Sequence, residues 1–233
     1  MMKNDLLLKN PLHQLGLTSE DSLPDGAFGA VLARAGIGKT AFLIQIALHT
    51  MLRDRNILHI SLEDPVDKVT LWYREVFNLL AEKRNLQAST PLWDELLPHR
   101  FIMTFKAEGF SAPKLEERMT DLMEQDIFHP HTLIVDGIPF DGEVRPLIED
   151  MKRLSVANGV RCWFTVRTHR HENAAPDGMP PQMAPCKDLF DVAIQLLPEG
   201  KDIHIRILKG LESPGGDTPV RFDPATMLIK ETV

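Results

Sequence analysis

The sequence has little cysteine, no excess of basic charge and no long apolar run, and each shortage excludes a class of protein. Its 233 residues include two cysteines, Cys162 and Cys186, which do not form the spacing of a disulfide framework or a metal motif. The formal net charge is −7, whereas proteins that bind nucleic acid mainly through its phosphates are usually basic or carry a clear basic stripe. No stretch approaches the roughly 18 consecutive apolar residues of a membrane-spanning helix, and the first residues do not form a signal peptide. We therefore expect a cytoplasmic protein without a membrane span.

What is present is an alternation of strand-like and helix-like segments. Short apolar runs that predict strands lie at 29–34, 56–62, 100–105, 131–138 and 160–168. Segments with helical apolar spacing lie between them, at 39–52, 65–84, 111–125 and 143–159. Strands separated by helices of this length are typical of βαβ units, so the sequence predicts the α/β class with a mostly parallel sheet.

The composition and the periodicity of apolar residues change after residue 169. Residues 170–187 are rich in Pro, Gly, Ala and Met and show no periodicity, so we expect a mobile loop there. The segments that follow are short, and 203–207 (IHIRI) alternates strictly, which predicts antiparallel strands at the C-terminal edge of the sheet. Neither a repeat nor a second core is evident, so 1–233 is predicted to be a single domain, with 1–20 as an N-terminal extension.

A phosphate-binding motif lies between the first strand and the first helix. Residues 33–41 read ARAGIGKTA, which is the P-loop (Walker A) pattern with alanine in place of its usual first glycine. Backbone N–H groups of such a loop hold phosphates, helped by the N-terminus of the helix that follows. The predicted nucleotide-binding residues are Ala33, Arg34, Ala35, Gly36, Ile37, Gly38, Lys39, Thr40 and Ala41. Among them, Lys39 is expected to reach the β and γ phosphates, and Thr40 to provide a hydroxyl ligand for Mg²⁺.

Two acidic residues follow buried strands and are candidates for the same site. Asp136 ends the apolar run LIVD, which fits the Walker B form and predicts a second Mg²⁺ anchor that acts through a water molecule. Glu63 follows the strand at 56–62, whose carboxyl end should lie on the same rim as the loop. Hydrolysis needs a carboxylate to orient the attacking water, and Glu63 is the better candidate, with Asp64 behind it. The alternative is that this acidic pair only starts the next helix.

The order of these motifs resembles the RecA-like P-loop ATPases, and within them the KaiC and DnaB-helicase branch. The resemblance rests on ARAGIGKT, ISLEDP, LIVDG and IHIRILKG and covers about residues 16–230. It implies a three-layer α/β sandwich, ATP and Mg²⁺ as ligands, and Glu63 as the catalytic glutamate.

The resemblance also implies roles near the end of the chain. Arg167 and Thr168 match the position of a polar sensor for the γ-phosphate, where the family often has glutamine or asparagine. Lys209 matches the lysine of a lysine–x–arginine pair that acts on the neighbouring subunit's site, or is simply a solvated lysine at a strand end. The arginine position holds Leu211, which departs from the family pattern.

These observations predict a Mg-ATP-dependent ATPase with slow hydrolysis, coupled to self-assembly as a homo-oligomer or to a protein partner. One alternative is a non-catalytic ATP-sensing regulator, which Leu211 favours. Another is a DNA-dependent helicase or recombinase module; DNA contact is possible through the basic run at 167–171, but the following loop has few basic residues and no aromatic for base stacking. A small-molecule kinase is a weaker alternative.

Overall fold

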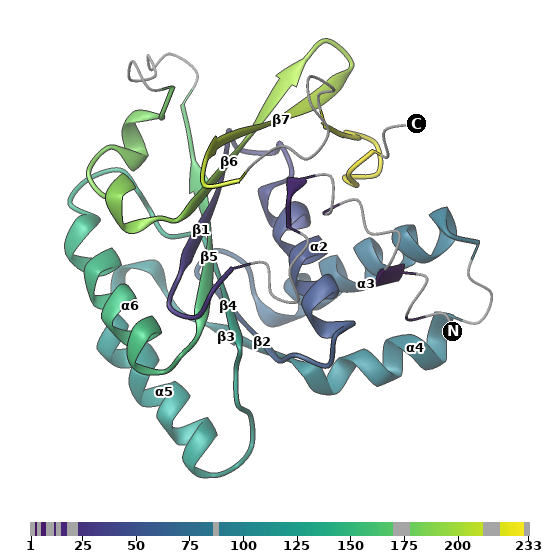
Figure 1. Ribbon diagram of the computed structural model, residues 1–233. Coiled ribbons are helices and arrows are strands. Elements are labelled where there is room, and N and C mark those ends of the chain that lie inside the picture. The colour runs from purple at the N-terminus through teal and green to yellow at the C-terminus, as the bar shows by residue number, and fades with distance from the viewer. Residues whose placement is uncertain are drawn as a thin grey trace.

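The computed structural model describes residues 3, 6–7, 12, 15–17, 23–85, 89–169, 178–211 and 220–230. These residues form an eight-stranded sheet with helices on both faces (Figure 1). The strands in chain order are β1 (Phe28–Ala33), β2 (Ile57–Ser61), β3 (Arg100–Thr104), β4 (Thr132–Asp136), β5 (Arg161–Arg167), β6 (Val192–Glu199), β7 (Asp202–Lys209) and β8 (Arg221–Phe222). The longer helices are α2 (Lys39–Met51), α3 (Val66–Lys83), α4 (Ser89–Leu96), α5 (Ala112–Glu124) and α6 (Arg145–Ala157).

The sheet is parallel over most of its width. The strand order is β3-β2-β4-β5-β1-β6-β7-β8, and every pair from β3 to β6 is parallel, whereas β7 and β8 are antiparallel. This confirms the predicted α/β class, with antiparallel strands at the C-terminal edge. One detail differs, because β6 is antiparallel only to β7 and is parallel to β1. The chain between β5 and β6 is long enough to cross over and re-enter the sheet in the direction of β1.

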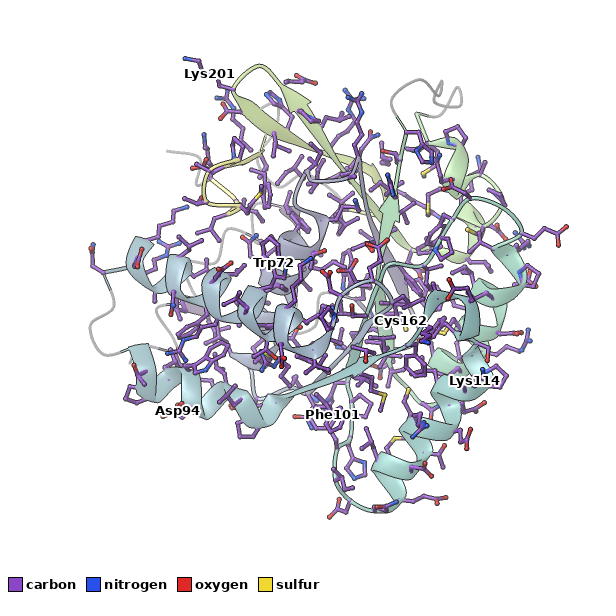
Figure 2. All side chains as sticks on the ribbon, turned by 180° about the vertical axis from the view of Figure 1, so that it is seen from behind. Trp72, Asp94, Phe101, Lys114, Cys162 and Lys201 are labelled. Atoms are coloured by element: carbon purple, nitrogen blue, oxygen red, sulfur yellow. The ribbon has the colours of Figure 1, made fainter. Side chains whose placement is uncertain are left out.

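Two apolar cores lie on the two faces of the sheet. One packs α2, α3 and α4, and the other packs α5 and α6. Leu12, Leu15 and Leu17 are buried in the first core, so the described part of the predicted N-terminal extension packs onto the domain. Side chains such as Cys162 fill the interior, and charged side chains such as Lys114 and Lys201 lie outside (Figure 2).

Helix α2 runs from the predicted phosphate loop into the first core. All its residues from Ala41 to Met51 are buried, which agrees with the apolar character of the sequence around the whole helix. Despite this apolar character, neither α2 nor any other helix in the described ranges is long and apolar enough to cross a membrane.

The second half of the predicted mobile loop has a packed structure. Residues 170–177 lie outside the described part, but 178–187 contains the 3₁₀ helix Pro181–Met183 and leads into another, Lys187–Leu189. Met183 and Cys186 are fully buried in the second core. Arg145 of α6 holds the segment by donating to the carbonyl oxygen of Pro185 at 2.7 Å and by an ion pair with Asp188. The Pro- and Met-rich composition therefore does not make this half an exposed loop, since its apolar side chains pack against α6.

Helix α4 was not predicted, because eight residues are too few to show a helical period. Its Trp93 packs against Phe77 of α3, with ring centroids 5.1 Å apart. The guanidinium of Arg100 lies 4.8 Å from the Tyr73 ring and 5.6 Å from the Trp93 ring. Tertiary packing against α3 and β3 thus stabilises a helix that has little periodic signal of its own.

Candidate nucleotide-binding site

The predicted phosphate loop joins β1 to α2 at the carboxyl edge of the sheet. Gly36 and Gly38 have φ values of 76° and 97°, a conformation that glycine adopts readily. The helix begins at Lys39, and no side chain caps its first turn. The N–H groups of that turn are therefore available to an anion, and the helix dipole favours negative charge at this end.

Alanine at the first position of the motif is tolerated. Ala33 is the last residue of β1, is buried, and is not among the non-glycine residues with positive φ in the described ranges. Its methyl group packs into the core, so alanine causes no backbone strain at this position.

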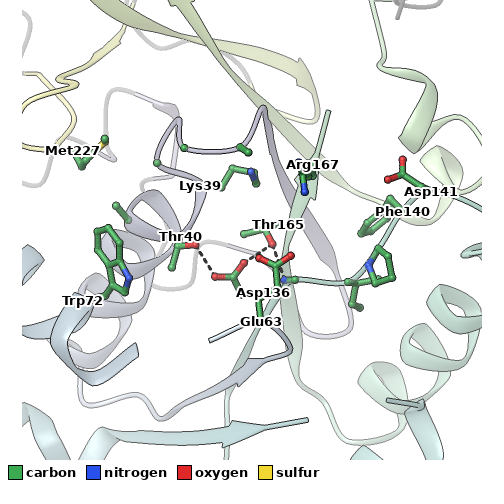
Figure 3. Close-up of a pocket in the computed structure, with 17 residues that line it drawn as sticks. Lys39, Thr40, Glu63, Trp72, Asp136, Phe140, Asp141, Thr165, Arg167 and Met227 are labelled. Atoms are coloured by element: carbon green, nitrogen blue, oxygen red, sulfur yellow. Dashed lines mark hydrogen bonds between the residues drawn. The ribbon is translucent and has the colours of Figure 1, made fainter. Parts of the chain in front are cut away.

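A cavity of about 330 Å³ opens in front of the loop (Figure 3). It is lined by six of the nine predicted nucleotide-binding residues, namely Ala35, Gly36, Gly38, Lys39, Thr40 and Ala41. The other three do not line it: Ala33 is buried, Arg34 lines a smaller cavity on another side of the loop, and Ile37 packs against the core. Glu63, Asp136 and Arg167 line the main cavity as well. Residues far apart in the sequence thus meet where the sequence predicts a site.

A hydrogen bond in the cavity joins the two predicted Mg²⁺ ligands. The Thr40 hydroxyl donates to Asp136 Oδ2 at 2.7 Å. The other carboxylate oxygen, Oδ1, accepts a hydrogen bond from the Thr165 hydroxyl at 2.6 Å (Figure 3). Thr165 also accepts the N–H of Gly137 at 3.1 Å. Asp136 is therefore held by two hydroxyl groups, one from α2 and one from β5.

Glu63 approaches the cavity over a glycine. Ser61 pairs with Asp136 across β2 and β4, which brings the residue two positions later to the same edge. Gly137 has φ of 95°, and a Cβ atom placed on it would lie 2.8 Å from Glu63 Cγ. Real Cβ atoms do not approach carbon so closely, so glycine at 137 is what allows the carboxylate of Glu63 to lie here.

Lys39 lies within the loop and donates from Nζ to the carbonyl oxygen of Arg34 at 3.2 Å. Burial lowers the pKa of this lysine, although the nearby carboxylates of Asp136 and Glu63 act in the opposite direction and Arg167 adds to the lowering. Desolvation disfavours its charged form, so an anion placed beside the ammonium would stabilise it.

The two sensor candidates have different surroundings. Arg167 lines the main cavity together with Lys39 and Glu63. Thr168 instead donates its N–H to the carbonyl oxygen of Ala33 at 3.0 Å and lines the smaller cavity of about 170 Å³. The structure therefore brings Arg167 to the site and Thr168 to the other side of the loop.

The predicted trans-acting position is tied to its own chain. Lys209 Nζ donates to the carbonyl oxygens of Lys187 and Phe190. Leu211, at the position where the resemblance predicts arginine, is half-buried against the apolar core. In this arrangement Lys209 supports the turn before β6 and does not extend away from the surface.

Several residues of the cavity were not identified from the sequence. They include Thr165, Trp72, Phe140, Asp141 and Met227. Thr165 carried one usable signal, because the strand next to a Walker B strand can place a hydroxyl beside its acid. Trp72 and Met227 lie on α3 and in the C-terminal segment, and no local pattern marks them.

The oxygen atoms at the loop are of the kind that binds Mg²⁺. Thr40 and Asp136 present hydroxyl and carboxylate oxygens, which this ion prefers, and they lie beside the helix N-terminus that would hold phosphate. No cluster of three or more His, Cys, Asp or Glu side chains that could hold a metal occurs among the described residues. Mg²⁺ usually takes one or two protein ligands and completes its shell with phosphate and water, so the residues fit a nucleotide-bound ion.

Comparison with known proteins adds no identification. No protein-family model matches the chain, and no significant match to a curated protein was found.

Proposed function

We propose that the chain is a P-loop ATPase of the RecA/KaiC-like type that binds Mg-ATP in the main cavity and hydrolyses it slowly. The observation that carries this proposal is the convergence of the helix N-terminus at Gly38 and Lys39 with Thr40, Asp136 and Glu63 in one cavity. These are the groups that phosphoryl transfer to water needs: donors for the phosphates, oxygens for Mg²⁺, and a carboxylate for the water.

Each side chain has a distinct task in this proposal. Lys39 leaves the Arg34 carbonyl and binds the phosphates, which restores the stability of its charged form. Thr40 and Asp136 hold Mg²⁺, which neutralises charge on the phosphates when bound. Glu63 orients a water molecule and accepts its proton, while the Arg167 guanidinium favours negative charge at the same end of the cavity.

The RecA-like assignment is supported by the order of elements. A P-loop, a strand followed by Glu63, a Walker B strand and antiparallel strands at the edge occur in the order that the resemblance implies. Since members of that family usually form rings or filaments, we propose ATP-dependent assembly with further copies of the chain or with a protein partner.

One observation favours a second candidate, a non-catalytic ATP-sensing regulator. The apolar packing of Leu211 and the anchoring of Lys209 leave this part of the chain without the charged pair that would act on a neighbouring subunit. Without that charge, transition-state stabilisation across an interface would be lost.

Phosphate release by the wild type and by Glu63→Gln separates the two candidates, with ATP binding measured in parallel. The ATPase proposal expects slow turnover in the wild type and a loss of about 10²-fold or more in the variant, with ATP still bound by both. If both bind ATP and neither releases phosphate, the enzyme proposal is wrong and the regulator is favoured.

A further inference from the structure

The two ends of the main cavity differ in charge, because the end with Phe140 also carries charged side chains and the opposite end carries none among the described residues. Trp72 and Met227 lie on one side of Thr40, whereas Arg167 and Asp141 lie on the opposite side (Figure 3). We infer that the Trp72–Met227 end binds the nucleotide base, an inference that rests on the proposed function. This end recognises the faces of a purine ring and not its hydrogen-bonding edge.

The position of the phosphates fixes the direction of the nucleotide. The donors of the helix N-terminus and Lys39 lie near the middle of the cavity, and Glu63 and Arg167 lie on the side of Lys39 away from Trp72, where the γ-phosphate would react. The base must then extend the other way, past Thr40, towards Trp72. An indole ring offers a planar surface for stacking, and a thioether packs well against aromatic rings.

Met227 is fixed in place for such a role. Its φ of 55° is unfavourable for a residue with a side chain and persists only where surrounding contacts impose it. Its N–H donates to the carbonyl oxygen of Asp223 at 2.7 Å, and its own carbonyl oxygen accepts from Gln45 Nε2 at 2.9 Å. Gln45 is buried on α2 and also accepts the N–H of Ile229 at 3.2 Å. It is therefore a positioning residue, which couples the C-terminal segment to the helix that carries the phosphate loop.

The same end has little with which to distinguish adenine from guanine. The two bases differ at the edge, where adenine has an amino group and guanine a carbonyl, whereas both have an N7 acceptor. Among the described side chains that line this end, the indole N–H of Trp72 is the polar group, and it can only donate. This N–H lies in the plane of the indole and cannot reach the edge of a base that stacks on the ring face. With no group among the described side chains on this side to bind the edge, the site should accept ATP and GTP with similar affinity.

The test measures binding of Mg-ATP, Mg-GTP and inorganic tripolyphosphate with Mg²⁺ to the wild type, Trp72→Ala and Gln45→Leu. Tripolyphosphate has the phosphates without the base. Trp72→Ala should weaken both nucleotides by roughly 5- to 150-fold, the range for loss of one stacked base, and leave tripolyphosphate binding unchanged. Gln45→Leu should also weaken the nucleotides more than tripolyphosphate. Leu71→Ala is the matched control, because Leu71 precedes Trp72 on α3 but is exposed and does not line the cavity.

Fluorescence of the wild type gives a readout that needs no variant. Of the three tryptophans, Trp93 and Trp163 are buried and Trp72 is half-buried at the cavity. Nucleotides should change the emission, and tripolyphosphate should leave it almost unchanged.

The inference is overturned if Trp72→Ala does not weaken ATP binding, or if the variant weakens tripolyphosphate binding equally. It is also overturned if ATP is preferred over GTP by more than about 100-fold, as edge recognition would give. If the wild type binds tripolyphosphate as tightly as ATP, the phosphate site stands and the base site is wrong. If it binds neither, the proposed function itself fails, and this inference with it.

Discussion

Replacing Gly137 by alanine tests whether Glu63 acts from its place in the cavity. The new Cβ atom would lie 2.8 Å from Glu63 Cγ, whereas carbon atoms in contact are about 3.5–4.0 Å apart. The carboxylate must therefore move by roughly 1 Å, and a misplacement of that size can cost about 10²-fold in rate. The φ of 95° adds a conformational cost of about 1–2 kcal/mol, which for a chain of this length lowers Tm by about 2–8 °C.

The assay is single-turnover phosphate release with ATP affinity measured separately. Turnover should fall about 10²-fold, and ATP affinity should change little, because no phosphate contact is altered. Gly159→Ala is the matched control, since Gly159 has φ of 61° and no atom within 4 Å of an added Cβ. It should lower Tm and leave turnover unchanged. Wild-type turnover in Gly137→Ala would refute the assignment of Glu63.

Two further predictions concern Thr165 and His59. Thr165→Val removes the hydrogen bond to Asp136 and the acceptor for the Gly137 N–H. The Mg²⁺ concentration for half-maximal ATP binding should therefore rise, and the free energy of unfolding should fall by about 1–3 kcal/mol. An unchanged Mg²⁺ dependence would contradict the role of Thr165. Burial lowers the pKa of His59 to about 4. Between pH 6.5 and pH 4 the unfolded chain therefore takes up a proton that the folded chain does not. The free energy of unfolding should fall over this range as the pH falls, by about 3 kcal/mol in total. Denaturant unfolding at pH 7 and pH 4 checks this, and a His59→Phe variant with the same pH dependence as the wild type would contradict it.

The local elements and the glycine-containing loop between β1 and α2 could be predicted because each leaves a signal in neighbouring residues. The alternation of apolar runs gave the strands and most helices, and ARAGIGKT marked the loop between them. The contact between Thr40 and Asp136 could be anticipated, since Asp136 ends one buried strand and Thr40 lies at the start of the helix that follows another, both at the carboxyl edge of the sheet.

What could not be predicted depends on strand order and long-range packing. Thr165 lies beside Asp136 only because β5 pairs with β4, and Met227 reaches the cavity through Gln45, which lies 182 residues earlier in the chain. The packing of Met183 and Cys186 could not be predicted for a related reason. The composition of a segment does not show which other element covers it, and here α6 covers the segment that contains these two residues.

Isothermal titration of Mg-ATP into the wild type and Lys39→Ala tests the central claim most directly. Lys201→Ala serves as the control, because Lys201 is exposed in the turn between β6 and β7 (Figure 2). The account predicts that the wild type and Lys201→Ala bind one Mg-ATP per chain with equal affinity, and that Lys39→Ala binds it at least about tenfold more weakly, as expected for the loss of a charged hydrogen bond to phosphate. Equal affinity in all three, or no binding to the wild type, would contradict the claim that this cavity is a nucleotide-binding site.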